Sequence, residues 1–152
     1  MMTPRTCIVY GTPAPQGSKD ILMIPRPGGH GPARPILRES SHATLKPWRL
    51  ALAHGWRDQC PGKPFEGPIT LIATFTLKRP VSEPKTRVTF PDRRPDLDKL
   101  ARALLDALTA GGAWHDDGQV ISMALTKTYP GVGHLSLPSP GVSVTVSQFD
   151  PG

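Results

Sequence analysis

Alternating apolar and polar positions divide the chain into helix-like and strand-like segments. The clearest helical pattern spans residues 97–110, where apolar side chains recur three and four residues apart and form one stripe. The stripe consists of Leu100, Ala101, Leu104, Leu105 and Leu108. Asp98 stands where an N-cap residue is expected, and Gly111-Gly112 stands where helices usually end. A second helical pattern begins at about Pro47, because Trp48, Ala51, Leu52 and Trp56 also recur at helical spacing.

Strand-like segments with β-branched or alternating residues surround these helices. They are a short strand within 6–17 and the segments 67–80, 118–130 and 141–150; residues 35–40 allow one more short strand. This order predicts a single α+β domain over residues 1–152. We expect two layers, a mixed sheet of about four strands and two main helices.

Residues 17–35 interrupt this pattern with a run rich in Gly and Pro. The run carries Lys19, Arg26 and Arg34 against a single acid, Asp20. A long connection without secondary structure in a small domain is typical of a binding loop or a mobile segment. We therefore predict a mobile basic loop here.

The charge balance of the chain indicates which class of partner it binds. The net charge is +6 at pH 7, from 18 Lys and Arg and 12 Asp and Glu. Such a balance favours polyanionic partners, nucleic acid first, although a basic protein without such a partner is the alternative. The two cysteines, Cys7 and Cys60, lack metal-site spacing, so we expect buried free thiols. No apolar run is long enough for a membrane span or a signal peptide, which favours the cytoplasm.

Negative charge is nevertheless concentrated in residues 93–120. This stretch holds five of the twelve acidic residues, namely Asp96, Asp98, Asp106, Asp116 and Asp117. Carboxylates brought close together repel one another, and a bound divalent cation would offset the repulsion. Mg²⁺ suits carboxylate ligands and a phosphate substrate. The alternative is that these residues are helix caps, turn residues and surface charges.

Other polar residues in the stretch allow two interpretations each. Asp98, Arg102 and Asp106 are spaced for a salt-bridge ladder on one helix face, and Arg102 either orients Asp98 or contacts the scissile phosphate. Strand alternation points His115 away from Asp116, so we expect an ordinary edge histidine. Trp114 could stack on a base, but packing beneath the loop is the preferred interpretation.

The order of motifs in this stretch is specific. The sequence DRRPDLDKLARALLDALTAGGAWHDDGQV, residues 92–120, places Asp-x-Asp at a helix start, Leu-Asp-Ala-Leu within the helix, an aromatic loop and then Asp-Asp-x-Gln-Val. With Lys127 a few residues further on, it resembles the RusA family of Holliday junction resolvases. The resemblance is sharp over 92–127 and looser over most of 6–150, beginning with the stretch YGTPAPQGSK.

This resemblance implies a homodimeric, Mg²⁺-dependent endonuclease, with Mn²⁺ as a possible substitute. It would bind four-way DNA junctions and resolve them by paired nicks in recombination and repair. Asp96, Asp98 and Asp117 would be metal ligands, with Asp116 a neighbouring or alternate ligand. The family's catalytic lysine falls at Arg102, and Lys99 stands where Asn is common, so either could supply the positive charge.

Basic residues outside the motif would then contact DNA. The predicted contacts are Lys19, Arg26, Arg34, Arg93, Arg94 and Lys127. For Lys127 a solvent-facing strand lysine is the competing interpretation. For the whole chain the alternatives are a non-catalytic or degenerate protein that binds branched DNA, and a nuclease acting on flaps or forks.

Overall fold

A four-stranded mixed sheet forms the centre of the protein. The computed structural model describes residues 1–17, 19–39 and 42–152. The sheet has the order β1 (Arg5–Tyr10), β6 (Gly141–Gln148), β4 (Ile69–Thr76) and β5 (Val120–Thr128). β6 pairs antiparallel with both of its neighbours, whereas β4 and β5 are parallel. Parallel neighbours need a crossover, and α2 (Leu97–Ala110) provides it.

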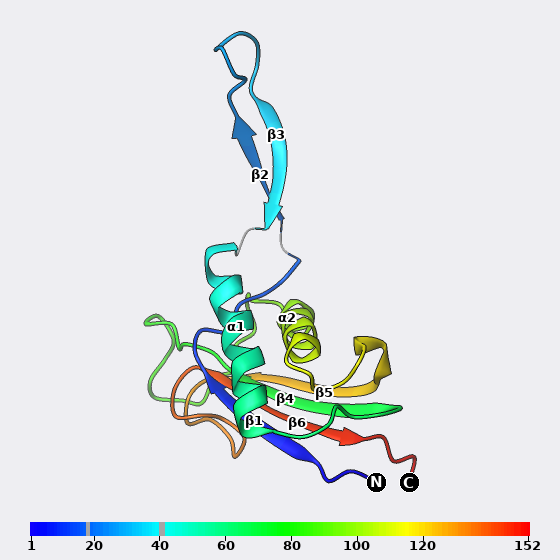
Figure 1. Cartoon of the computed structure of the whole chain (residues 1–152). Helices are drawn as coiled ribbons and strands as arrows, with labels where there is room; N and C mark the ends of the chain where they lie inside the picture. Colours follow the sequence, from blue (N-terminus) through cyan, green and yellow to red (C-terminus); the bar gives the residue numbers. More distant parts are fainter. Residues whose placement is uncertain (18, 40–41) are drawn as a thin grey trace.

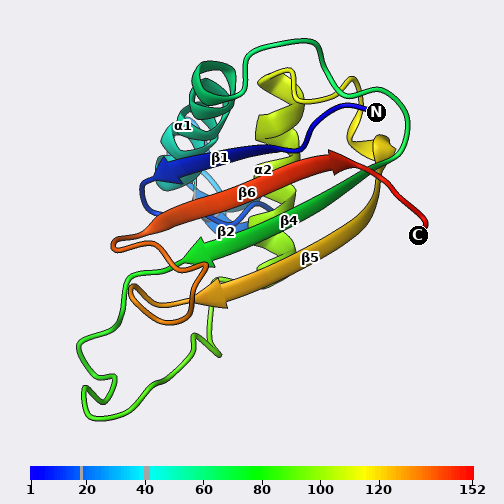
Figure 2. The same ribbon diagram turned by 90° about the horizontal axis from the view of Figure 1, so that it is seen from below.

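Both helices lie on the same face of this sheet (Figures 1 and 2). α1 (His42–Gln59) contributes Trp56 and Leu52 to the core, and α2 contributes the leucine stripe predicted from the sequence. Alternate residues of the central strands, such as Leu71 and Val144, meet them and are fully buried. The other face of the sheet carries mostly Thr and Ser, with Ile72 exposed. The predicted two-layer α+β architecture is therefore confirmed.

The observed bounds of α2 agree with those predicted from the sequence, whereas those of α1 differ. α2 spans the residues predicted. α1 begins at His42, so Pro47 lies inside the helix and not in its first turn. Proline lacks the N–H that would bond to the preceding turn, and its ring crowds the carbonyl four residues earlier, but α1 still forms one more turn ahead of it. No helix in the described part of the chain is long and apolar enough to cross a membrane.

Residues 17–35 were predicted as a loop, and here the prediction was wrong. β2 (Lys19–Ile24) and β3 (Arg34–Glu39) pair antiparallel, and their hairpin projects away from the body of the protein (Figure 1). The runs around Ile21 and Ile36 are β-forming, but the Pro- and Gly-rich turn between them dominates the composition. Its mobility stays a prediction. We call residues 19–39 the arm.

The two cysteines are unpaired and buried, as predicted. Burial raises the pKa of the Cys7 thiol to about 12 and also raises that of Cys60. The Cys60 thiol donates to the carbonyl of Thr6 at 3.5 Å. Both thiols are therefore protonated, and unreactive, near neutral pH.

The contact between α1 and β1 leaves no room for a side chain at Gly55. A Cβ there would lie 2.5 Å from Val9 Cγ2. We therefore expect Gly55→Ala to lower the free energy of unfolding by about 1–3 kcal/mol, although Ala is the better helix former. Urea denaturation measures this. Adding Val9→Ala should recover part of the loss, and a stabilised Gly55→Ala variant would contradict the packing.

Candidate functional site

Two exposed carboxylates mark the start of α2. Asp96, with extended backbone (φ −71°, ψ 140°), is the N-cap, so the predicted N-cap role of Asp98 was wrong by two residues. Asp98 lies in the first turn. The Asp96 side chain makes no capping hydrogen bond, and its Oδ2 lies 3.5 Å from Lys99 Nζ. Both side chains therefore have oxygens available to a ligand.

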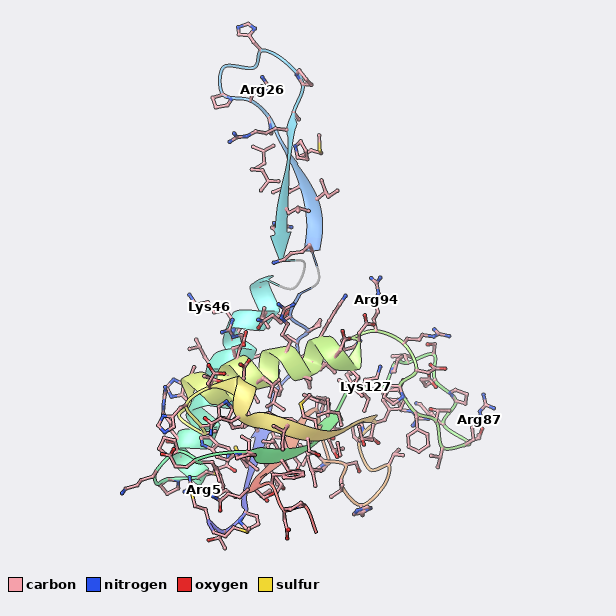
Figure 3. The ribbon with its side chains drawn as sticks, turned by 90° about the vertical axis from the view of Figure 1, so that its right-hand side faces the viewer. Arg5, Arg26, Lys46, Arg87, Arg94 and Lys127 are labelled. Carbon is pink, nitrogen blue, oxygen red and sulfur yellow. The ribbon has the colours of Figure 1, made fainter. Side chains whose placement is uncertain are left out.

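Lys127 holds the segment that leads into Asp96. Its Nζ donates to the carbonyls of Arg93 at 2.8 Å and Pro95 at 3.0 Å. The parallel register places Lys127 beside Phe75, near the ends of β4 and β5, where α2 begins. Figure 3 shows Lys127 beneath this end of α2. The contact was not expected from the sequence, which gave Lys127 a role in DNA binding; that role stays a prediction.

A basic cavity adjoins the same end of α2. Its volume is about 210 Å³. Lys78, Arg93 and Arg94 line it, together with Glu83 and Tyr129. The cations beside the Asp96–Asp98 pair therefore come from the loop between β4 and α2, as the basic character of that loop suggested.

The second pair of carboxylates lies beyond the other end of α2. Asp116 and Asp117 are exposed at the short 3-10 turn η1 (Asp117–Gln119). Asp116 Oδ1 accepts from the backbone N–H of Gly118 at 2.6 Å and so caps the turn. Its second oxygen and the exposed Asp117 side chain have no hydrogen-bond or ion-pair partner in the described part of the chain.

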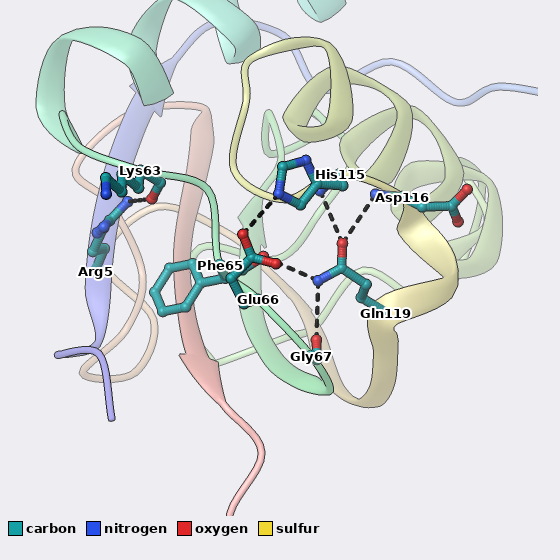
Figure 4. Close-up of polar contacts among 8 residues, drawn as sticks. All are labelled: Arg5, Lys63, Phe65, Glu66, Gly67, His115, Asp116 and Gln119. Atoms are coloured by element: carbon teal, nitrogen blue, oxygen red, sulfur yellow. Dashed lines mark hydrogen bonds and ion pairs between the residues drawn. The ribbon is translucent and has the colours of Figure 1, made fainter.

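Gln119 fixes the position of this turn (Figure 4). Its Oε1 accepts from the backbone N–H groups of His115 at 2.9 Å and Asp116 at 3.1 Å. Its Nε2 donates to the carbonyls of Phe65 and Gly67, both at 3.0 Å. Sequence reasoning missed this role. The signal was the spacing, because Gln three residues after an Asp is the pattern of a capping box.

Asp106 has a different partner from the one predicted. Gln16 Nε2 donates to Asp106 Oδ2. Among the ion pairs of the described residues none joins Asp98, Arg102 and Asp106, so the predicted salt-bridge ladder does not form. Asp106 also lines a shallow hollow that it shares with Arg49 and the Asp116–Asp117 pair. Arg102 is exposed one turn beyond Asp98.

Neighbouring aromatic and imidazole groups are structural. Trp114 is buried, and its indole N–H donates to Thr109 Oγ1 at 2.8 Å, so the preferred packing interpretation is confirmed. His115 Nε2 lies 3.0 Å from Glu66 Oε1 at an exposed position. His115 therefore pairs with Glu66, away from the carboxylates of the turn.

The two acidic pairs lie at opposite ends of α2. A helix of 14 residues is about 20 Å long, far more than the reach of one metal ion. In the described residues, no group of three His, Cys, Asp or Glu side chains could hold a metal. Within one chain the two pairs therefore do not meet, because helix and return loop do not double back, and the assignment of Asp96, Asp98 and Asp117 as metal ligands stays a prediction.

The remaining predicted DNA contacts are on the arm. Lys19, Arg26 and Arg34 belong to β2, the turn and β3, and Figure 3 shows Arg26 at the far end of the hairpin. Arg26 therefore lies far from both ends of α2. The basic surface thus has two parts, one on the arm and one at the cavity beside Asp96.

Comparison with known proteins identifies what this arrangement is similar to. The family model described as Endodeoxyribonuclease RusA matches residues 31–146. A crossover junction endodeoxyribonuclease RusA from Escherichia coli strain K12 is 53% identical over 38 residues, which cover 24% of this chain and 32% of that protein. The protein of the same description from Shigella sonnei strain Ss046 gives the same values. The match thus spans about a third of the length of these curated relatives.

The lysine contact beneath α2 can be tested without DNA. We expect Lys127→Met to lower the free energy of unfolding by about 1–3 kcal/mol, because two carbonyls lose a charged donor. Lys85→Met, which changes an exposed loop lysine, is the control and should leave stability nearly unchanged. If both variants unfold at the same urea concentration as the parent, Lys127 does not hold the segment before Asp96.

Proposed function

Because the chain belongs to the RusA family of endodeoxyribonucleases, we propose that it cuts branched DNA and resolves four-way junctions by paired nicks. The relatives are named crossover junction endodeoxyribonucleases, which supports this choice of substrate. A net charge of +6 supports a polyanionic partner. Binding should rest on phosphate contacts and fall steeply with salt.

The observation that carries the proposal is the Asp96–Asp98 pair. Asp96 uses neither oxygen to cap its own helix, and a cavity with three cations adjoins it. Exposed acids beside a phosphate-binding surface would weaken DNA binding if they had no further purpose. If the acids hold a metal cation against the phosphodiester, the negative Asp96–Asp98 pair and the positive cavity beside it both have a role.

One chain alone does not fit a Mg²⁺ site with three acidic ligands, because its pairs lie at opposite ends of α2. We propose that the protein acts as a homodimer in which the Asp96–Asp98 pair of one copy meets the Asp116–Asp117 pair of the other. Carboxylate oxygens are the ligands that Mg²⁺ prefers, and Mn²⁺ would substitute. When bound, the ion would neutralise charge on the phosphodiester.

The cations near Asp96 have separate tasks in this proposal. Arg93 and Arg94, at the cavity, bind the DNA backbone and set its register. Lys99 lies beside Asp96, and Arg102 is one turn further along α2. Either can stabilise the charge that develops on the phosphate oxygens during hydrolysis. Lys99 lies close to the Asp96 carboxylate, and the Arg102 guanidinium lies against Gly17, just before the arm.

Removing one acid should separate cleavage from binding. We expect Asp98→Asn to reduce nicking of a labelled four-way junction by about 100-fold or more, while junction affinity is kept or increased because a negative charge is lost. Removing Mg²⁺ with a chelator should likewise stop cleavage. The exposed Asp150→Asn change is the control and should cleave normally. Duplex, flap and fork substrates in the same panel measure selectivity.

Two outcomes would overturn this assignment. Normal cleavage by Asp98→Asn would exclude Asp98 from the reaction. Intact junction binding without cleavage by the parent protein, at any Mg²⁺ or Mn²⁺ concentration, would favour a non-catalytic protein that binds branched DNA.

Mixed dimers test whether the site is shared between copies. Neither Asp98→Asn nor Asp117→Asn should cleave alone. In a dimer of one copy of each, the first shared site would carry both changes and the second would carry none. We therefore expect the mixture to regain nicking at one strand per junction. If the site were built within one chain, both sites of the mixed dimer would be damaged and no activity would return.

A further inference from the structure

The arm exposes an apolar face that nothing in its own chain covers. The β2–β3 register places Ile21 opposite Leu37 and Met23 opposite Pro35, so these four side chains share one face. Ile21 is 67%, Met23 56% and Leu37 70% exposed. We call this set the arm face. Such a continuous aliphatic surface usually marks an interface.

The arm also has no packing against the rest of its own chain that would stabilise the hairpin. Within the described part of the chain, β2 and β3 form a separate two-stranded sheet and pair only with each other. A two-stranded hairpin is marginal in water unless it packs against something else. Gln16, just before the arm, is fixed to the body because its N–H donates to the Lys99 carbonyl at 3.0 Å. From there the arm projects away from the helices (Figures 1 and 3), so its own body does not provide the packing.

A complementary surface lies between α1 and α2. A groove of about 410 Å³ is lined by Leu45, Lys46, Arg49, Leu50, Ala107 and Ala110, and we call it the helix groove. Leu50 is 52% exposed there. The small side chains of Ala107 and Ala110 leave room for aliphatic side chains from a partner.

The charges on the arm and beside the helix groove indicate which surface the arm contacts. The arm carries Arg26, Arg34 and Arg38, and next to the helix groove lies the hollow formed by Asp106 and the Asp116–Asp117 pair. Arg49 lines both surfaces, which makes them continuous. A basic hairpin seated in the groove would therefore lie beside acids. A flat aliphatic face does not suit DNA phosphates, which need cations.

We propose that the arm face packs in the helix groove of a second copy of this chain. The same chain supplies both halves of the contact, so a two-fold axis forms it twice. The proposal deepens the homodimer of the proposed function and rests on it. It gives each arm two sides, with the arm face on the partner copy and the other face, where Arg34 and Arg38 lie beside Leu22 and Ile36, turned outward.

Single cysteines on separate chains test this contact directly. One chain carries Leu37→Cys and the other Leu50→Cys; the native Cys7 and Cys60 are buried and do not compete. Mild oxidation of the mixture without DNA should give the mixed disulfide as the main product. Leu37→Cys mixed with Ile72→Cys is the control, because Ile72 is similarly exposed, at 46%, on the open face of the sheet.

A second measurement does not depend on disulfide geometry. Ile21→Glu combined with Leu37→Glu should raise the dimer dissociation constant, measured by sedimentation, at least about tenfold. Val88→Glu, at a position 69% exposed, is the matched control and should leave it unchanged. An unchanged dissociation constant for the double variant would overturn the proposal, as would a disulfide formed only between two Leu37→Cys chains.

These results are independent of the catalytic test. If mixed dimers regain cleavage but no disulfide joins Leu37→Cys to Leu50→Cys, the copies share an active site without seating the arm, and the present inference fails alone. If the disulfide forms but no variant or parent protein cleaves DNA, the arm contact stands and the proposed function fails.

Discussion

Burial of one face of α2 against the sheet determines where the charged groups of this protein lie. Leu100, Leu104 and Leu108 are fully buried, and the helix joins the parallel strands β4 and β5. The helix can therefore neither shorten nor turn without exposing its leucines, which would cost several kcal/mol. Its rigid length keeps the two acidic pairs about 20 Å apart. The separation of the two acidic pairs within one chain therefore follows from hydrophobic packing.

The acids are positioned mainly through hydrogen bonds to the backbone segments that carry them. Lys127 gives its N–H groups to the carbonyls before Asp96, and Gln119 makes four hydrogen bonds around the turn that holds Asp116. Because the backbone is held in this way, carboxylate oxygens remain available to bind a ligand. Carboxylates held in this way keep their negative charge for a ligand, apart from Asp96, which has Lys99 Nζ 3.5 Å away.

The sequence predicted best where a local pattern decides the structure. The bounds of α2 followed from its leucine stripe and the glycines after it, and the buried Trp114 followed from ordinary packing. Distance in space could not be predicted in the same way, since the spacing of Asp98 and Asp117 along the chain says nothing of how far a rigid helix holds them apart. The β2–β3 hairpin was missed because its two apolar runs have no burial within one chain, so their pattern had no core to match.

The turn of the arm has a consequence for how this protein can diversify. A side chain added at Gly28 or Gly29 would touch nothing within 4 Å, and the turn lies far from the buried core. Insertions and new charges there carry almost no folding penalty, as at other exposed loop tips. Natural variation can therefore lengthen or recharge the turn without unfolding the protein. The leucines of α2, in contrast, must stay nearly constant for the chain to fold.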